Sequence, residues 1–350
     1  MVFGHGDDVY RYGSKIKYNF SSNIPAFADL SGLKVHLAKK LDVISSYPEP
    51  EARRLEELIA AEEGITPQQV LVTAGATEAI YLIAQLYRGY VSIIPQPTFN
   101  EYADAAMAHG HIITYHNEEL DYVPGKRLYW ICNPNNPTGY VMQKTLISYI
   151  IRHQRDNVFV VDESYEDYTL QPVLKTHEMQ DCHNLILLHS MTKRYCIPGL
   201  RLGYITASPI IIDRLRLIRQ PWTVNALAIE AGEYLVGNHI EVIPDREGYI
   251  EEAIRLHEQL NQLNGLMFME SEANFMLGYL ENYSARELKQ WLIDHYGILI
   301  RDASNFHGLD SNCFRVAAQT PEQNVLLVEA IREFLERPDN SVNRHSHERL

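Results

Sequence analysis

Short apolar runs alternate with amphipathic stretches through the middle of the chain, which is the pattern of a parallel β-sheet covered by helices. The apolar runs predict strands at Val70–Thr73, Val91–Pro95, His111–Tyr115, Leu128–Cys132, Val158–Asp162, Leu185–His189 and Leu202–Thr206. The amphipathic stretches predict helices at Glu51–Glu63, Ala76–Tyr87, Phe99–His109, Gln143–Arg155, Ile210–Arg219 and Val224–Val236. This order of elements predicts an α/β fold.

The pattern changes after Asn238. The elements predicted there are helix Tyr249–Leu263, strand Phe275–Tyr279, helix Ala285–Tyr296, strands Ile298–Arg301 and Cys313–Ala317, and helix Pro321–Leu335. We therefore expect a large domain over residues 46–237 and a smaller α+β domain over residues 238–336. Residues 1–45, with only Leu33–Leu41 weakly helical, are expected to form an arm and part of the small domain. The polar segment 337–350 is expected to be disordered.

The composition agrees with two domains in one globular chain. A length of 350 residues exceeds one core of usual size, and 46% hydrophobic with 22% charged residues is typical of soluble proteins. No apolar run reaches the roughly 18 residues of a membrane span, and the first residues resemble no secretory signal. The cysteines lie far apart, so we expect no metal site or disulfide framework, and a cytoplasmic location. They are Cys132, Cys182, Cys196 and Cys313.

The formal net charge is −14. Such a charge repels nucleic acid and anionic lipid, so neither is an expected partner. A small anionic ligand remains compatible with it. That ligand must be held by local cations and helix N-termini, because the overall field opposes it.

A glycine-centred turn, Ala74–Glu78, follows the first predicted strand and opens a helix. The first N–H groups of a helix lack internal partners and favour an anion. With the Thr77 hydroxyl, the turn is a candidate phosphate site, although it equally fits a plain capped turn between strand and helix. The nucleotide motifs GxGxxG and GxxxxGK[ST] do not occur in the chain.

The loop Asn133–Gly139 follows the strand Leu128–Cys132 and contains two prolines and a glycine. Such residues make a rigid loop at the carboxyl edge of the sheet, where α/β proteins bind ligands. An asparagine held there can donate a hydrogen bond to a ring oxygen of a ligand.

Asp162 ends an apolar strand, where a carboxylate is costly unless a cation meets it. A pyridinium nitrogen would serve as that cation, since the carboxylate would keep the ring protonated. The alternative is that Asp162 caps a following helix.

A lysine segment, Ser190–Tyr204, also follows a strand. A partly desolvated lysine beside cations has a lowered pKa and acts as a nucleophile toward carbonyl groups. Arg201 lies eight residues after Lys193 and could pair with a phosphate.

These motifs, in this order and over nearly the whole chain, resemble the fold-type I, aspartate-aminotransferase-like family of pyridoxal-phosphate (PLP) enzymes. The resemblance implies a three-layer α/β/α large domain with a mostly parallel seven-stranded sheet, a smaller α+β domain, and PLP as cofactor. Lys193 then corresponds to the lysine that binds the cofactor covalently, and Asp162 to the aspartate on the pyridine nitrogen. Asn136 and Tyr165 correspond to the pair on the ring hydroxyl, and Phe99 to the aromatic residue stacked on the ring. The phosphate is implied to bind at Gly75, Ala76, Thr77, Ser190, Thr192 and Arg201.

Within this family, the lysine segment, Gly297–Asp302 and the N-terminal His5-Gly6 are similar to the threonine-phosphate decarboxylases of cobalamin biosynthesis. Those enzymes convert L-threonine O-3-phosphate to (R)-1-amino-2-propanol O-2-phosphate and CO2. Histidinol-phosphate aminotransferases, which use 2-oxoglutarate, share every cofactor contact and are the alternative. A PLP-binding protein without catalysis is a third hypothesis, from another class.

Cofactor contacts do not separate these reactions, because the bond to Cα that is held perpendicular to the ring is the one that breaks. A perpendicular carboxylate leads to decarboxylation and a perpendicular hydrogen to transamination. The residues that hold the substrate decide, and the resemblance implies His5, Gly6, Asn23, Arg301 and Arg315. Arg315 would hold the carboxylate, and Arg301 with His5-Gly6 the phosphate. A guanidinium suits both anions, so the assignment of the two arginines stays open.

Tyr47, in Tyr47–Pro50, resembles the tyrosine that reaches the cofactor phosphate of the neighbouring subunit, which implies a homodimer with shared active sites. The chain departs from the family in two places. The element Ser21–Ala26 is a degraded Asn-x-Asn-Pro-x-Gly, and Gly6 is followed by Asp7-Asp8 where the family has a second glycine. Two carboxylates would repel a phosphate there unless they point away, and His5 equally fits a solvated terminal histidine.

Overall fold

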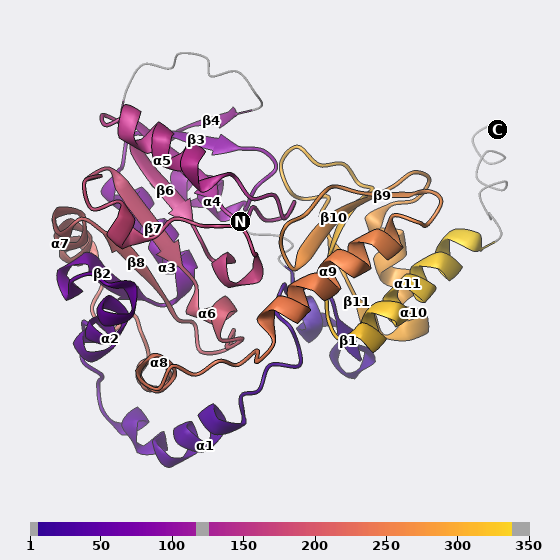
Figure 1. Ribbon diagram of the computed structural model, residues 1–350, viewed down its shortest axis with the longest axis horizontal. Helices are drawn as coiled ribbons and strands as arrows, with labels where there is room; N and C mark the ends of the chain where they lie inside the picture. Colours follow the sequence, from indigo (N-terminus) through magenta and orange to yellow (C-terminus); the bar gives the residue numbers. More distant parts are fainter. Residues whose placement is uncertain (1–5, 117–125, 338–350) are drawn as a thin grey trace, which may run out of the picture.

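The structure, a computed structural model, describes residues 6–116 and 126–337. It has two parts that lie side by side (Figure 1). One is built on a seven-stranded sheet and the other on a four-stranded sheet. No described helix is long and apolar enough to cross a membrane.

The large sheet confirms the predicted α/β fold. Its strand order is β2 (Val70–Thr73), β8 (Gly203–Ala207), β7 (Leu185–His189), β6 (Val158–Asp162), β5 (Arg127–Cys132), β3 (Val91–Pro95) and β4 (Ile112–His116). Neighbouring strands are parallel, except that β8 runs antiparallel to β2 and β7. The parallel strands therefore bring their carboxyl ends to one edge.

Helices cover both faces of this sheet, because successive side chains of a strand point to opposite sides. Val160 packs in the cluster with helices α3 (Gly75–Leu86), α4 (Glu101–Ala108) and α7 (Pro209–Ile218). Phe159 and Val161 pack on the other face, against α5 (Lys144–His153). Helices α2 (Arg53–Glu63) and α8 (Ala226–Gly237) cover that same second face beside α5. The predicted three-layer arrangement is thus confirmed.

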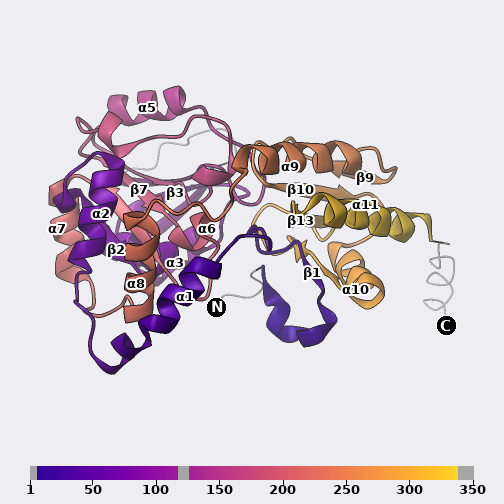
Figure 2. The same ribbon diagram turned by 60° about the horizontal axis from the view of Figure 1, so that its bottom comes forward.

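The four-stranded sheet is antiparallel, in the order β12 (Arg301–Asp302), β13 (Cys313–Ala317), β10 (Phe275–Leu280) and β9 (Leu266–Phe268). Helices α9 (Arg246–Leu260), α10 (Ala285–Tyr296) and α11 (Pro321–Glu336) lie around it (Figure 2). The N-terminal segment joins this part, since β1 (Tyr18–Asn19) pairs with β11 (Ile298–Leu299). Helix α1 (Ser31–Lys39) instead contacts α8 of the large part. The N-terminal segment thus contacts both parts.

Most predicted elements are present with ends shifted by a few residues. The predicted strand Ile298–Arg301 is two short strands, because the chain changes partner at Ile300: β11 pairs with β1, and β12 with β13. Strands β1 and β9 and the short helix α6 (Met191–Arg194) were not predicted. The expected domain boundaries stay predictions, and residues 338–350 of the expected disordered tail lie outside the described residues.

Candidate active site

A cavity of about 560 Å³ lies at the carboxyl edge of the large sheet and reaches the four-stranded sheet. The predicted site residues that line it are Gly6, Ala76, Thr77, Phe99, Asn136, Asp162, Tyr165, Ser190, Thr192, Lys193, Arg201, Arg301 and Arg315. Gly75, Asn23 and Tyr47 are not among its lining residues, and His5 lies outside the described residues. The structure therefore brings residues from eight separate stretches of the chain to one place.

Lys193 stands on the short helix α6, directly after β7. Its Nζ donates a hydrogen bond to the Ser22 carbonyl oxygen at 3.0 Å and lies 5.6 Å from the centre of the Tyr165 ring. Burial, followed by the positive charge of Arg315, lowers the pKa of Lys193 to about 8. More of the lysine is thus neutral amine at neutral pH, the form that attacks a carbonyl carbon.

Asp162 ends β6 with its carboxylate buried. Its Oδ1 accepts a hydrogen bond from the Ser164 N–H at 2.9 Å, and its Oδ2 accepts one from the Tyr102 hydroxyl at 2.7 Å. Burial raises the pKa of Asp162 above its ordinary value despite these donors. The alternative that Asp162 caps a helix is wrong, because the next helical turn begins at Glu166 and its N-cap is Tyr165.

Tyr102 is a site residue that the sequence did not reveal. It lies on α4, fully buried, with its ring stacked on Trp130 at 5.2 Å between centres. In sequence it resembles an ordinary core aromatic, since nothing marks its hydroxyl as the partner of Asp162. Its role is to hold that carboxylate, 60 residues further along the chain.

The predicted phosphate turn has the required backbone geometry. Helix α3 begins at Gly75, whose φ is +81°, and a Cβ there would lie 2.7 Å from Arg201 Nη2. Only glycine allows the guanidinium to come this close to the turn. Arg201 otherwise contacts neutral oxygens, the Thr192 hydroxyl and the Pro198 carbonyl, both at 3.4 Å. No carboxylate among the described residues pairs with it, so its charge suits a phosphate between the turn and α6.

Arg301 and Arg315 are direct neighbours on β12 and β13. Their exposed fractions are 6% and 4%, and within residues 6–116 and 126–337 neither has a carboxylate partner. Arg301 donates to Asn305 Oδ1 at 2.5 Å; Arg315 donates to Asn136 Oδ1 and, at 2.7 Å, to the Ser21 carbonyl oxygen. Burial, with the neighbouring Arg315, lowers the pKa of Arg301 to about 10, and burial alone lowers that of Arg315 to about 10.

Two adjacent buried guanidinium groups repel each other and have lost water, so their arrangement is costly unless anions bind there. Arg315 Nε also has no hydrogen-bond partner among the described residues. Together with Arg201, the cavity therefore offers three cations for anionic groups.

Tyr165 and Phe99 complete the walls around Lys193. Burial raises the pKa of Tyr165 to about 12, although Arg315 works against this, so its hydroxyl stays protonated. Asn23 is fully buried beside that hydroxyl, and neither polar atom of its side-chain amide has a regular hydrogen-bond partner in the described chain. Its predicted contact with substrate stays a prediction.

Asp7 and Asp8 do not act alike. Asp8 turns away to α10, where Lys289 Nζ lies 2.9 Å from its Oδ2. Asp7 lines the cavity and accepts a hydrogen bond from Asn19 Nδ2 at 2.6 Å. The condition that both carboxylates point away from the anion site is thus met by Asp8 and not by Asp7.

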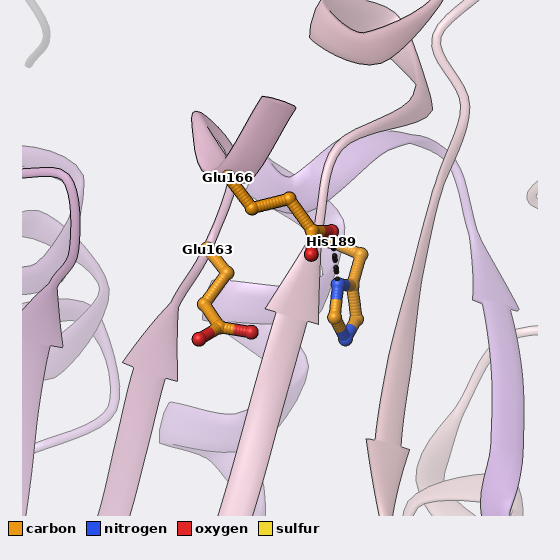
Figure 3. Close-up of side chains that lie close together, drawn as sticks. All are labelled: Glu163, Glu166 and His189. Atoms are coloured by element: carbon orange, nitrogen blue, oxygen red, sulfur yellow. Dashed lines mark hydrogen bonds and ion pairs between the residues drawn. The ribbon is translucent and has the colours of Figure 1, made fainter. Parts of the chain in front are cut away.

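A second group of ionisable side chains gathers at the ends of β6 and β7 (Figure 3). Glu163, Glu166 and His189 bring potential metal ligands within 4.8 Å of one another. His189 Nδ1 lies 2.7 Å from Glu166 Oε1, and Lys175 Nζ lies 2.8 Å from the other oxygen. Burial would raise the pKa of Glu166, but His189 and Lys175 hold it well below its usual range.

These partners make the group an ion network. Burial alone would lower the pKa of His189, but the neighbouring Glu166 carboxylate raises this pKa above its ordinary value. The pKa of Glu163 is raised well above its ordinary value by burial. Since Lys175 and His189 already contact the two oxygens of Glu166, a metal ion would have to displace them. The network ties the loop after β6 to the end of β7, which precedes the lysine helix.

Comparison with known proteins agrees with this geometry. The chain matches the Aminotransferase class I and II family over residues 15–331. It is 31% identical to a putative threonine-phosphate decarboxylase of Caldanaerobacter subterraneus, over 95% of this chain and 94% of the other. It is 32% identical to a histidinol-phosphate aminotransferase of the same organism, over 83% and 85%. The crystal structure of L-threonine-O-3-phosphate decarboxylase from Porphyromonas gingivalis superposes with a TM-score of 0.88 and 36% identity, covering 92% of this chain and all of the other.

The fold and the lysine cavity define a fold-type I PLP-binding protein. The chain belongs to the aminotransferase class I and II family, whose members bind pyridoxal phosphate. The residues present fit this cofactor: Lys193 has a lowered pKa, Asp162 is a buried carboxylate, and Arg201 packs on the glycine turn without a carboxylate partner in the described chain.

Proposed function

We propose that the protein decarboxylates L-threonine O-3-phosphate to (R)-1-amino-2-propanol O-2-phosphate and CO2. The observation that carries the proposal is the pair of buried arginines, Arg301 and Arg315, beside the cofactor lysine. Arg201 suits the cofactor phosphate, which leaves two cations for the substrate. L-Threonine O-3-phosphate carries two anionic groups, a carboxylate and a phosphate. Two relatives reported above are named as decarboxylases of this compound.

Bound pyridoxal phosphate supplies an electron sink for the pair of electrons left when a bond at the substrate Cα breaks. Asp162 would hold the proton on the pyridine nitrogen, with Tyr102 fixing the carboxylate. Asn136 and Tyr165 would donate to the ring oxygen, and Phe99 would lie against the ring face. Ala76, Thr77, Ser190, Thr192 and Arg201 would hold the phosphate, together with Gly75 in the turn.

The substrate contacts follow from the positions of the arginines. Arg315, joined to Asn136, would hold the carboxylate, and Arg301, next to Gly6 on the arm, the phosphate. Such a grip would orient the bond from Cα to the carboxylate for cleavage. When that bond breaks, CO2 leaves and Cα needs a proton, which Lys193 Nζ can supply because its pKa lies close to neutrality.

The second candidate is a histidinol-phosphate aminotransferase, favoured by the 32% identical relative of that name. Its amino-group donor, L-histidinol phosphate, carries one anionic group, and only its keto acid, 2-oxoglutarate, carries two, so the arginine pair favours the decarboxylase and admits the aminotransferase. The decarboxylase needs no keto acid. Dependence on a keto acid therefore separates the two.

We further propose a homodimer, in the cytoplasm, in which Tyr47 completes the partner's cofactor site. Tyr47 is 84% exposed and does not line the cavity of its own chain. The centre of its ring lies 5.1 Å from the ring centre of the half-exposed Trp222. Aromatic residues are enriched at protein interfaces, and this exposed pair supports the proposed dimer. Sedimentation equilibrium of wild type and Tyr47→Ala, with cofactor titration of both, tests this: a monomeric wild type would contradict it.

The activity is tested by incubating the purified holoenzyme with L-threonine O-3-phosphate and measuring CO2. The proposal expects CO2 release in the absence of any keto acid, and none from L-threonine at equal concentration. Turnover of L-histidinol phosphate that requires 2-oxoglutarate and forms glutamate would establish the aminotransferase instead. Normal cofactor absorbance with neither activity would favour the non-catalytic alternative.

A further inference from the structure

The N-terminal segment Gly6–Asp8 runs directly over the two substrate arginines. A Cβ at Gly6 would lie 2.5 Å from the Ser21 carbonyl oxygen, 3.2 Å from Arg315 Nη2 and 3.5 Å from Arg301 Cδ. The first of these distances is too short for any side chain to be accommodated. The backbone at Gly6 therefore forms the cavity wall beside Arg301 and Arg315.

Few contacts hold the segment in this place. Asp7 donates its N–H to Ser21 Oγ at 3.0 Å and accepts from Asn19. Its φ of 64° is a left-handed conformation that a residue other than glycine adopts at a cost. The strained backbone at Asp7 has to be maintained by neighbouring interactions.

Asp8 supplies the strongest of these interactions. Its exposed fraction is 8%, and Lys289 Nζ donates to both carboxylate oxygens, at 3.0 and 2.9 Å. Lys289 comes from α10, 281 residues away in sequence, and its ammonium also lies 5.6 Å from the centre of the Tyr12 ring. This lysine thus contacts the arm at two points and joins it to the small part of the protein.

The charge of Asp8 also reaches the substrate site, because it acts on Arg301 to raise that residue's pKa against the effect of burial. If Lys289 were absent, the nearly buried carboxylate would lose its ion-pair partner, which is costly. The Gly6–Asp8 segment would then lose the ion pair that joins it to α10.

We propose that Lys289 is a positioning residue for the substrate site. Through its ion pair with Asp8 it fixes the Gly6–Asp8 segment over Arg301 and Arg315. The proposal rests on the proposed function only for the identity of the substrate.

The test compares four variants of the holoenzyme: Lys289→Met, Lys289→Arg, the double variant Asp8→Asn with Lys289→Met, and Lys144→Met. The last removes the partly exposed ion pair that Lys144, on α5, makes with Glu178, and it serves as the control. Amide hydrogen exchange of residues 6–16 is measured without substrate, and KM and kcat are measured with L-threonine O-3-phosphate. Cofactor absorbance and thermal unfolding verify that each variant is folded.

In the Lys289→Met variant, the amides of residues 6–16 should exchange faster than in wild type. Its KM should rise about tenfold or more, with kcat within about twofold of wild type, as expected when a charge pair that positions a binding group is lost. The double variant should exchange as fast and show a similar rise in KM, because it too has lost the ion pair that fixes the arm. Lys289→Arg should restore both properties, and the control should match wild type.

Wild-type exchange and wild-type KM in Lys289→Met would overturn the proposal. So would a double variant with wild-type exchange and wild-type KM, because the effect of Lys289→Met would then come from the unpaired carboxylate and not from the loss of the ion pair. If the wild type does not turn over the substrate at all, the proposed function fails, and hydrogen exchange alone still decides whether Lys289 fixes the arm.

Discussion

Replacing Lys193 by methionine should stabilise the protein stripped of its cofactor. Methionine fills a similar volume without a charge, so the change removes the cost of holding an ammonium group in the cavity. That cost follows from the pKa of Lys193, which burial and Arg315 lower from 10.5 to about 8. At about 1.4 kcal/mol for each pH unit, this is at most about 3 kcal/mol, and water in the open cavity reduces it toward about 1 kcal/mol.

The pH dependence identifies the cause. Below pH 8 the folded protein carries the charged lysine and the full cost applies. Between pH 8 and 10.5 the folded state has lost the proton while the unfolded chain keeps it, so the stability of the wild type rises with pH relative to the variant. Above 10.5 both states are neutral and only a constant packing difference remains.

Urea unfolding of the cofactor-free wild type and Lys193→Met, from pH 7 to 10.5, measures this difference in the free energy of unfolding. Lys175→Met is the contrasting variant, because Glu166 raises the pKa of Lys175 against burial and the ammonium is stabilising. It should be less stable than wild type throughout, by about 1–2 kcal/mol, because Glu166 is nearly buried but water screens the 39% exposed Lys175. A difference for Lys193→Met that does not narrow with rising pH would refute the lowered pKa.

Three further predictions concern the cofactor and substrate contacts. Tyr102→Phe removes the hydroxyl that donates a hydrogen bond to Asp162. Because a hydrogen bond to a charged group is worth about 1.5–3 kcal/mol, PLP binding should weaken about tenfold or more. An unchanged Kd for PLP in an absorbance titration would show that Tyr102 does not support the cofactor through Asp162. Gly75→Ala places a Cβ against Arg201 at a residue whose φ is +81°, and it should therefore lower PLP affinity. Far-ultraviolet circular dichroism should stay native. Wild-type PLP affinity in this variant would show that the turn adapts to the Cβ. Arg301→Gln should reduce kcat/KM for the phosphorylated substrate about tenfold to a hundredfold, with little effect on cofactor absorbance. If the variant lost as much binding affinity for L-threonine, followed by cofactor absorbance, as for the phosphorylated substrate, Arg301 would lie away from the phosphate.

The sequence predicted the large sheet and the meeting of the candidate motifs at one cavity, because both depend on local patterns. Strands such as Val158–Asp162 are apolar runs of the right length, and each motif follows a strand, so parallel order alone brings them to one edge. Strand β9 was missed because three residues are too few to show alternation, and Ile298–Arg301 was predicted as one strand because a change of partner leaves no local mark.

The missed site residues act through contacts that are distant in sequence or made by backbone. Tyr102 reads as a core aromatic, and only the fold places its hydroxyl on Asp162. Ser21 and Ser22 act through carbonyl oxygens, on Arg315 and Lys193, which side-chain patterns do not reveal. The expected repulsion by Asp8 could not be evaluated without knowing of Lys289, 281 residues away.

The most direct test of the proposed reaction is the number of CO2 molecules released per active site when the holoenzyme meets excess L-threonine O-3-phosphate without a keto acid. A decarboxylase keeps its cofactor in the active form, so CO2 should accumulate to many times the number of active sites, with an equal amount of 1-amino-2-propanol phosphate. An aminotransferase would convert its cofactor once and stop, releasing no CO2. Release of no more than one CO2 per site, or turnover that begins only when 2-oxoglutarate is added, would contradict the proposed function.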